Sequence, residues 1–444
     1  MRNLREIAIG RILWRVVIGV FAAVSWGALS LQPQNSSYPA QKSSPPTIVS
    51  QIVVLPESVV QRQWTHTLKL INAPQNASLL NPGQCIRVAI YSTGDNRDNY
   101  LENTKLSFKV EFAGHSDFHP LESLLEVKQI KPAGGDFVSA ALSSAGIELP
   151  ATTKTMASLG ASAGRWCVPV DASDGTATVE AKVESSRGHQ PLNPSIIQIE
   201  SFETGSKKSF TDVDQLGEFS LAYYRQPNPA RLLPALQFLI ANQTQQLREG
   251  QAEIFAAFLG AAIKSDPIAA HDFLIRIGAQ PPLTRAFGLL VLQSAGYDIS
   301  SVLNTLSAED QQKFHTLSPL QDPFDLTPSE DLFHHLDMLW AVFGATGELK
   351  PVQTISSALS WRADYEGFDK LRKAPKHPST LTPSIVRGVV YTAAGWSLLS
   401  FQRNDPLVAD YIDFMRASPD TPPVVKSELA GLSTNPAFER PGGP

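Results

Sequence analysis

Titratable side chains are concentrated in one short stretch of the chain, EDLFHHLDMLW, which runs from Glu330 to Trp340. Three carboxylates and two adjacent histidines lie within these eleven residues. Histidine nitrogens and carboxylate oxygens are common protein ligands of zinc and related metal ions. On a helix, Glu330, His334 and Asp337 would lie above one another on one face, so the stretch is a candidate metal site.

The same stretch also has a structural interpretation, as the polar side of a capped helix. Thr327 fits the N-cap, Pro328 the first helical position, and Glu330 the third, where its side chain can reach back to the cap. The residues that would share the buried face are Leu332, Leu336, Leu339, Trp340 and Phe343. His334 and Asp337 are then predicted to be largely exposed. We favour this interpretation, because a metal site would need further ligands from a neighbouring helix.

A second candidate metal site is the motif HSDFH. In an extended chain, His115, Asp117 and His119 would share one side and present three metal ligands. Gly114 and Pro120 bracket the motif, which favours a surface loop instead. The chain has no phosphate-cradling glycine loop and no zinc-type cysteine pair, so no cofactor is expected.

The N-terminal residues have the pattern of an export signal. An uncharged run from Val16 to Leu31 follows four arginines, Arg2, Arg5, Arg11 and Arg15. This pattern predicts a signal peptide over residues 1–30. Alternatively, residues 12–31 remain as a single membrane anchor. In both cases the body of the protein is predicted to be extracytoplasmic, either periplasmic or secreted, since the basic flank favours the cytoplasmic side.

Composition and cysteine content narrow the class of protein. The 444 residues are 43% hydrophobic and 18% charged, with a net charge of -5. Nucleic-acid binding is not expected, because it relies on a basic surface. The cysteines, Cys85 and Cys167, are expected to form a disulfide, since an exported chain meets an oxidising environment.

A proline- and serine-rich tether, predicted to be disordered, covers residues 31–47 and precedes a region of short strands. In KLSFKVEF, residues 105–112, apolar side chains alternate with polar ones, which is typical of a strand with one buried face. The stretches CIRVAIY and TATVEAKV alternate in the same way. Residues 48–204 are therefore predicted to form an antiparallel, immunoglobulin-like β-sandwich in which Cys85 and Cys167 open strands.

Helical periodicity follows a linker predicted at residues 205–212. We expect an all-α domain over residues 213–432 and a disordered tail over residues 433–444. Three segments contain an apolar helix, a polar turn and a proline that opens the next helix; these prolines are Pro267, Pro351 and Pro406. The predicted architecture is a stack of helical hairpins.

The segment LDMLWAVFGATGELKPVQTISSAL resembles part of an uncharacterised family of bacterial helical proteins with the pattern L-D-x-L-W-x-x-F-x-A-T-G. A later segment, AAGWSLLSFQRNDPLVADYI, is similar to a W-S-L helix of that family. The resemblance covers residues 330–415 and implies helical hairpins but no activity. The family-pattern positions are Asp337, Trp340, Thr346 and Gly347. Packing, capping and turning the chain are their expected roles.

Together these features predict a non-enzymatic scaffold or binding module for protein partners in a bacterial envelope. The alternative is an exported carbohydrate-active enzyme, because a β-sandwich followed by an α/α toroid recurs among such enzymes. Paired carboxylates such as Asp322 and Asp325 would then act as acid and base. The sequence predicts roughly ten helices, which is fewer than a closed toroid needs.

Overall fold

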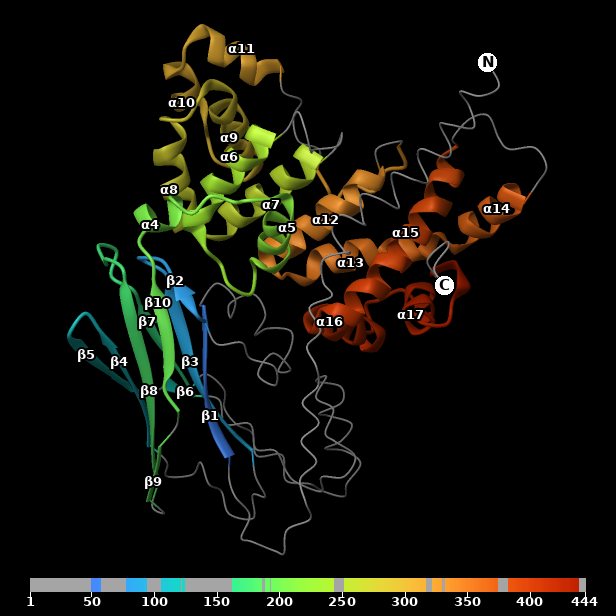
Figure 1. Cartoon of the computed structure of the whole chain (residues 1–444). Helices are drawn as coiled ribbons and strands as arrows, with labels where there is room; N and C mark the ends of the chain where they lie inside the picture. The colour runs from blue at the N-terminus through green and yellow to red at the C-terminus, as the bar shows by residue number, and fades with distance from the viewer. Residues whose placement is uncertain are drawn as a thin grey trace, which may run out of the picture. The chain divides into compact units, whose positions relative to one another are not determined.

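The chain divides into two compact units, whose helices and strands are labelled in Figure 1. The computed structural model describes residues 49–56, 77–93, 105–120, 122–123, 162–185, 188–191, 193–242, 251–316, 322–329, 332–373 and 382–438. The sheet unit comprises the described residues up to Lys208 together with Arg225–Ala230. The helical unit comprises Ser209–Tyr224 and the described residues from Arg231 onward. The fold is therefore mixed, with a small sheet region and a mostly helical part.

Two sheets form the sheet unit. The first has the strand order β1 (Val49–Pro56), β3 (Cys85–Thr93), β7 (Ser162–Cys167) and β6 (Glu122–Ser123). The second has the order β2 (Leu79–Leu80), β10 (Ser195–Ile199), β8 (Gly175–Ser185), β4 (Lys105–Phe112) and β5 (His115–Pro120), and β9 (Gly188–Pro191) also pairs with β8. The β2–β10 pair is parallel and the other described pairs are antiparallel. A short helix, α4 (Phe202–Ser206), follows β10.

Alternation along the strands produces the core of the sheet unit. On β4, Phe108 and Val110 are buried, whereas Glu111 is exposed. The burial predicted for one face of this strand is thus confirmed. Buried side chains from both sheets belong to one hydrophobic cluster, which includes Val54, Ile86, Val88, Trp166, Ala177, Val179 and Ile197. The two sheets therefore share one core.

A disulfide joins Cys85 to Cys167, as predicted from the sequence. The two residues lie directly opposite each other in the register of β3 and β7. Their Cα atoms are 3.9 Å apart, which is less than the ~4.4 to 6.8 Å that disulfides usually span. Cys85 opens β3 as predicted. Cys167 ends β7 rather than opening a strand, because the residues that pair with β3 are the ones before it, from Ser162 onward.

The helical unit contains more helices than the roughly ten predicted from the sequence. They are α5 (Val213–Ala222), α6 (Leu232–Asn242), α7 (Gln251–Ser265), α8 (Pro267–Ile277), α9 (Pro282–Ser294), α10 (Ser300–Thr305), α11 (Ala308–Thr316), α12 (Leu332–Thr346), α13 (Leu349–Ser357), α14 (Arg362–Lys373), α15 (Pro383–Asn404), α16 (Pro406–Ala417) and α17 (Pro423–Ala430). Short 3₁₀ turns occur at η3 (Ala358–Trp361) and η4 (Pro436–Phe438), and a further one, η2 (Pro229–Arg231), crosses the boundary between the units.

Proline opens several of these helices, where its missing N–H leaves no hydrogen bond unmade. Pro267 and Pro406 begin α8 and α16 as predicted. Each follows an aspartate N-cap, and the Oδ1 atom of Asp266 accepts hydrogen bonds from the amides of Ile268 and Ala269. The prediction for Pro351 is wrong by two residues, since α13 begins at Leu349.

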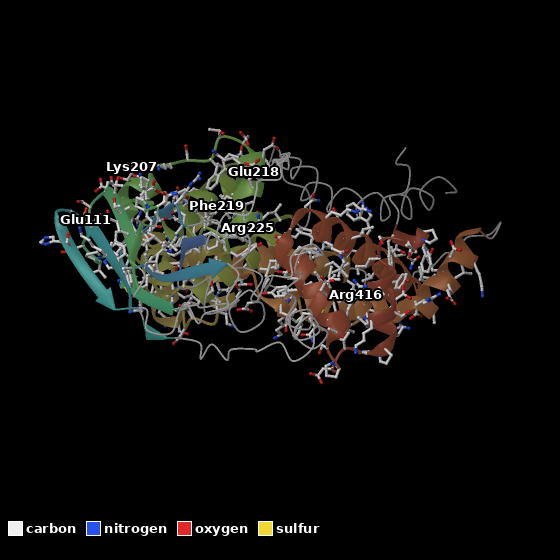
Figure 2. The ribbon with its side chains drawn as sticks, turned by 90° about the horizontal axis from the view of Figure 1, so that it is seen from below. Glu111, Lys207, Glu218, Phe219, Arg225 and Arg416 are labelled. Atoms are coloured by element: carbon white, nitrogen blue, oxygen red, sulfur yellow. A yellow bond between two sulfur atoms is a disulfide. The ribbon has the colours of Figure 1, made fainter. Side chains whose placement is uncertain are left out.

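Helix α12 lies in the middle of the helical unit and packs against α5, α7, α13 and α15. Gly344 is needed on α12 because a side chain there would collide with the backbone of α5 at Ser220. Phe219 of α5, labelled in Figure 2, belongs to the aromatic part of the core. Its ring packs edge-on against those of Tyr223 and Phe258. A helix covered on several sides has little room for a wholly solvated face.

Two predicted domain boundaries differ from the structure. Within the predicted 205–212 linker, residues 205 and 206 belong to α4, and the two units divide between Lys208 and Ser209. The predicted tail over residues 433–444 is folded as far as Phe438, which is buried against Gly395 of α15. The sequence prediction missed this contact because an aromatic side chain at a chain end has no periodic pattern around it.

The predicted signal or anchor and the tether, residues 1–47, lie outside the described residues. Among the helices that the structure describes, none is both long and apolar enough to cross a membrane.

Candidate functional site

The residues of the candidate metal site on α12 are not arranged as a capped polar face. The helix begins at Leu332, several residues after the predicted start at Pro328. Thr327 does not cap it, because its amide and hydroxyl both donate hydrogen bonds to Oδ1 of Asp325. Glu330 lies outside the described residues. The predicted capping box is therefore wrong at Thr327, and the apolar face is correct, since its five predicted residues are buried.

One of the two adjacent histidines is part of the core. His335 is only 6% exposed, and its Nδ1 lies 2.6 Å from the backbone oxygen of Asp325. The contact attaches the segment before α12 to the helix, and it gives the imidazole a structural role.

The other two predicted ligands, His334 and Asp337, are half-buried rather than largely exposed. Burial raises the pKa of Asp337 to about 7. Neither a positive charge nor a hydrogen-bond donor in the described chain offsets that effect. Asp337 can therefore gain or lose a proton near neutral pH, which is an unusual property for an aspartate.

Trp340 lies one turn further along α12 and is 3% exposed. Its ring stacks on Phe401 of α15, with centroids 3.9 Å apart and planes 10° from parallel. The indole N–H finds no hydrogen-bond acceptor within the described part of the chain. Trp340 thus contributes apolar packing between α12 and α15, as expected for its position.

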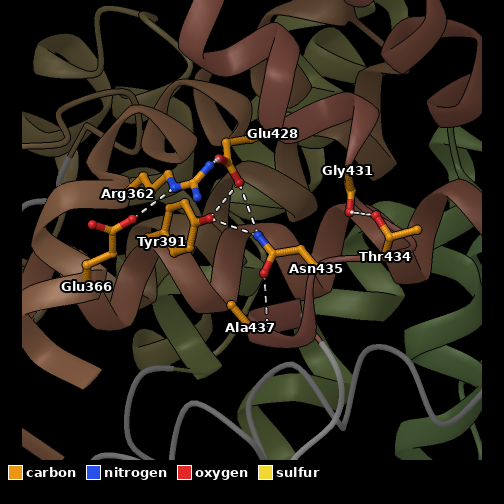
Figure 3. Close-up of polar contacts among 8 residues, drawn as sticks. All are labelled: Arg362, Glu366, Tyr391, Glu428, Gly431, Thr434, Asn435 and Ala437. Carbon is orange, nitrogen blue, oxygen red and sulfur yellow. Dashed lines mark hydrogen bonds and ion pairs between the residues drawn. The ribbon is translucent and has the colours of Figure 1, made fainter. Parts of the chain in front are cut away.

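A polar network that joins several segments of the helical unit surrounds Glu428 of α17 (Figure 3). Glu428 is 2% exposed, and its Oε1 accepts a hydrogen bond from Arg362 at 2.9 Å. Its Oε2 accepts from the Tyr391 hydroxyl at 2.6 Å and from the side-chain amide of Asn435 at 3.1 Å. Arg362 also pairs with the exposed Glu366 on its own helix.

Each oxygen of the Glu428 carboxylate is therefore occupied by donors from other segments. Burial raises the pKa of Tyr391, and the hydrogen bond to Glu428 raises it further, so the phenol keeps its proton and remains a donor. Such a carboxylate is poorly placed to act as a base or to bind a cation. It joins α14, α15, α17 and the segment after α17. The sequence gives little sign of this network, because its members lie far apart in the chain.

A similar arrangement occurs at the start of α16. The buried carboxylate of Asp405 caps that helix at the amide of Leu407. It also accepts from the Tyr224 hydroxyl, at 2.9 Å from each carboxylate oxygen. Tyr411 of α16 donates to the backbone oxygen of Gly347 at 2.7 Å. These contacts connect the ends of α5, α12 and α15, and they too have structural roles.

The second predicted metal motif lies in strand β5, not in a surface loop. The register places His115 opposite Phe112, Asp117 opposite Val110 and His119 opposite Phe108. His115 is exposed. Within the residues open to description, no group of three or more histidine, cysteine or acidic side chains is arranged to hold a metal ion.

The carboxylates considered for the enzyme alternative make local turn contacts. Oδ1 of Asp322 accepts from the amide of Phe324 at 3.0 Å, and Oδ1 of Asp325 accepts from Thr327. Hydrogen bonds from the hydroxyl and the amide of Thr327 lower the pKa of Asp325. Both side chains thereby stabilise the turn that precedes α12.

Comparison with known proteins identifies no family for this chain. The chain matches no protein-family model, and no curated protein is significantly similar to it in sequence.

Proposed function

We propose that this chain is an exported, non-enzymatic scaffold or binding module for protein partners of a bacterial envelope. The N-terminal arginines and the apolar run that follows them support export, through either a cleaved signal or a retained anchor. The likeness of residues 330–415 to a family of bacterial helical proteins supports the bacterial assignment.

One surface of the helical unit carries this proposal. Ile275 of α8 is 64% exposed, and Leu274 and Leu283 are also exposed large apolar side chains. They lie where α8 ends and α9 begins, on two helices that pack against each other. We call these three residues the α8–α9 apolar patch. Exposed apolar side chains that gather in one place are typical of a protein–protein contact surface.

A charged pair next to the patch gives it a polar border. Arg276 and Asp272 of α8 form an ion pair at 2.7 Å. Burial raises the pKa of Asp272 to about 6, although the Arg276 guanidinium opposes that shift. An apolar centre with a charged rim is the usual composition of a non-obligate interface.

The proposal includes the type of β-sandwich and the arrangement of the helices as stacked hairpins. Two sheets with a shared core support an immunoglobulin-like sandwich, and consecutive packed helices such as α7 and α8 support stacked helical hairpins. The disulfide is a departure from the immunoglobulin pattern, because it joins neighbouring strands of one sheet rather than the two sheets.

The enzyme alternative has one argument in its favour and one against it. The helices α5 to α17 exceed the number predicted, so helix number no longer counts against an α/α toroid. Against it, the carboxylates of Asp322 and Asp325 accept hydrogen bonds from groups of their own turn, the amide of Phe324 and the amide and hydroxyl of Thr327. We therefore retain the binding module as the proposed function.

Site-specific cross-linking in intact cells tests the proposal. A photoreactive residue at Ile275 should give discrete adducts with a protein partner, and one at the exposed Gln293 of α9 should not. The Leu283→Lys change should weaken the adduct formed at position 275 while leaving the helical content unchanged. Equal adducts at positions 275 and 293, or none at either position, would contradict the proposal.

A further inference from the structure

The Cys85–Cys167 disulfide faces away from the core of the sheet unit. Side chains alternate between the two faces of a sheet along each strand. Ile86 and Trp166, which pair directly beside the cysteines, are buried in the core. The cysteines must then project from the opposite face, and both are half-exposed. A thiol in solution can therefore approach the sulfur atoms.

The two sulfur atoms have different electrostatic surroundings. The Nη2 of Arg165 lies 3.1 Å from Sγ of Cys85. Arg165 precedes Cys167 by two residues on β7, so it shares the outer face with the disulfide. A guanidinium beside a sulfur stabilises the thiolate and lowers the thiol pKa. A thiolate of lower pKa is also the better leaving group in disulfide exchange.

We propose that this disulfide is a site of thiol–disulfide exchange with an external dithiol, in which Cys85 is the leaving thiolate and Arg165 stabilises it. One thiolate of the dithiol attacks Sγ of Cys167. The sulfur–sulfur bond breaks, and its electron pair leaves on Sγ of Cys85. The second thiolate of the dithiol then displaces the sulfur of Cys167 and closes the dithiol's own disulfide. The chain gains two electrons and two protons, and the dithiol loses them.

The sheet has other contacts that hold its register when the bond is open. Strands β3 and β7 remain paired from Cys85 opposite Cys167 as far as Ile90 opposite Ser162. Beyond the cysteines, the amide of Val168 donates to the backbone oxygen of Gln84 at 2.9 Å. The structural change on reduction is therefore confined to the outer face, where it exposes a thiol pair beside Arg165.

The first test measures how fast dithiothreitol reduces the disulfide of the native full chain. Arg165→Gln should slow reduction about three- to tenfold, because it removes the charge that stabilises the leaving thiolate. Lys207→Gln is the matched control, since it removes one positive charge from an exposed pair with Glu203 in the same unit. Alkylation and intact mass report the reduced fraction. Reduction of the Arg165 variant at the unmodified rate, or no reduction without denaturant, would overturn the proposal.

The second test asks which sulfur is attacked and which leaves. Glutathione added to the native protein should give a mixed disulfide that peptide mapping places on Cys167. In a Cys167→Ser variant, the pH dependence of iodoacetamide alkylation should give Cys85 a thiol pKa below ~8.5, and adding Arg165→Gln should raise it. An adduct chiefly on Cys85 would overturn the assignment, and mapping needs no cysteine variant to fold. Near-UV circular dichroism of the reduced protein should retain its aromatic bands, and their loss would contradict a local change.

Discussion

Two carboxylates of the helical unit, those of Glu428 and Asp337, are both partly or fully removed from water but differ in their hydrogen-bond donors. Glu428 is almost fully buried and receives hydrogen bonds from three side chains, one of them an arginine. Asp337 is only half-buried, yet burial raises its pKa to about 7, because no donor in the described chain compensates for the lost water. The comparison shows that hydrogen-bond donors, more than depth, decide whether a buried carboxylate is compensated for the water that it loses.

The largest effect on stability is expected when the carboxylate of Glu428 is removed. Glu428→Ala should lower the free energy of unfolding by ~3 to 5 kcal/mol, because it leaves buried donors without acceptors and Arg362 without its partner. Glu366→Ala removes the exposed partner of the same arginine and should cost about 0.5 kcal/mol or less. Chemical denaturation measures both. Similar losses of unfolding free energy in the two variants would mean that the buried network stabilises the protein no more than the exposed ion pair does.

Trp340 tests whether packing or hydrogen bonding dominates beside Asp337. Trp340→Ala should cost ~3 to 5 kcal/mol through the cavity that it leaves against Phe401. Trp340→Phe keeps a ring and should cost only ~1 to 2 kcal/mol, because the lost indole N–H has no described acceptor. If the phenylalanine variant were as unstable as the alanine variant, a hydrogen bond from the indole would have to exist.

Asp337 should make stability depend on pH in the direction opposite to that of most paired carboxylates. Its folded pKa of about 7 exceeds the unfolded value of ~3.9, so the folded state binds the proton more tightly. The resulting stabilisation is complete below pH ~4 and is lost as the pH rises through about 7. We expect a loss of ~1 to 2 kcal/mol, since the half-buried side chain is partly hydrated.

Thermal unfolding between pH 4 and pH 8 measures this dependence. Asp337→Asn should reduce that slope, most of all above pH 6, because Asp272, whose pKa is raised to about 6, contributes at lower pH. Glu366→Ala should retain the full slope. A slope between pH 6 and pH 8 that is unchanged in Asp337→Asn would assign the titration to another group.

The smallest effect is expected at His334, the residue next to a buried histidine. His334→Ala should change stability by about 0.5 kcal/mol or less, because the side chain is partly exposed and makes no hydrogen bond or ion pair with the described part of the chain. His335→Ala should cost ~1 to 3 kcal/mol, since it removes the contact with the Asp325 backbone oxygen. Equal effects would mean that the neighbouring positions are not as different as their burial indicates.

Local sequence patterns account for much of the secondary structure. The alternation around Phe108 and Val110 placed them correctly on a buried strand face, and the apolar period placed Leu336 and Trp340 correctly in the helical core. Prolines marked the starts of α8 and α16 correctly, because proline fixes its own φ angle and lacks an N–H, and both effects act within one helical turn. Pro351 was misleading, since proline is tolerated elsewhere in the first turn of a helix.

The candidate site was predicted less well for a physical reason. Periodicity identifies one buried face of a helix, but it does not say whether other helices cover the remaining faces. Helix α12 contacts several neighbours, so His335 became a core residue and Asp337 lost part of its water. Sequence spacing brought His334 and Asp337 onto one helix face, but it could not supply the neighbouring groups that determine their chemistry.

The sequence by itself determined that a region of strands precedes a region of helices, which apolar faces are most clearly buried, and that a cysteine pair is available for a disulfide, because each depends on composition or short-range periodicity. Only the tertiary structure decided which acids have partners. Glu428 receives donors from Tyr391, 37 positions earlier in the chain, and from Arg362, 66 positions earlier. Tertiary structure likewise placed Arg165 against Cys85, 80 positions away. Contacts at these separations depend on how whole elements pack, and no local pattern of residues encodes them.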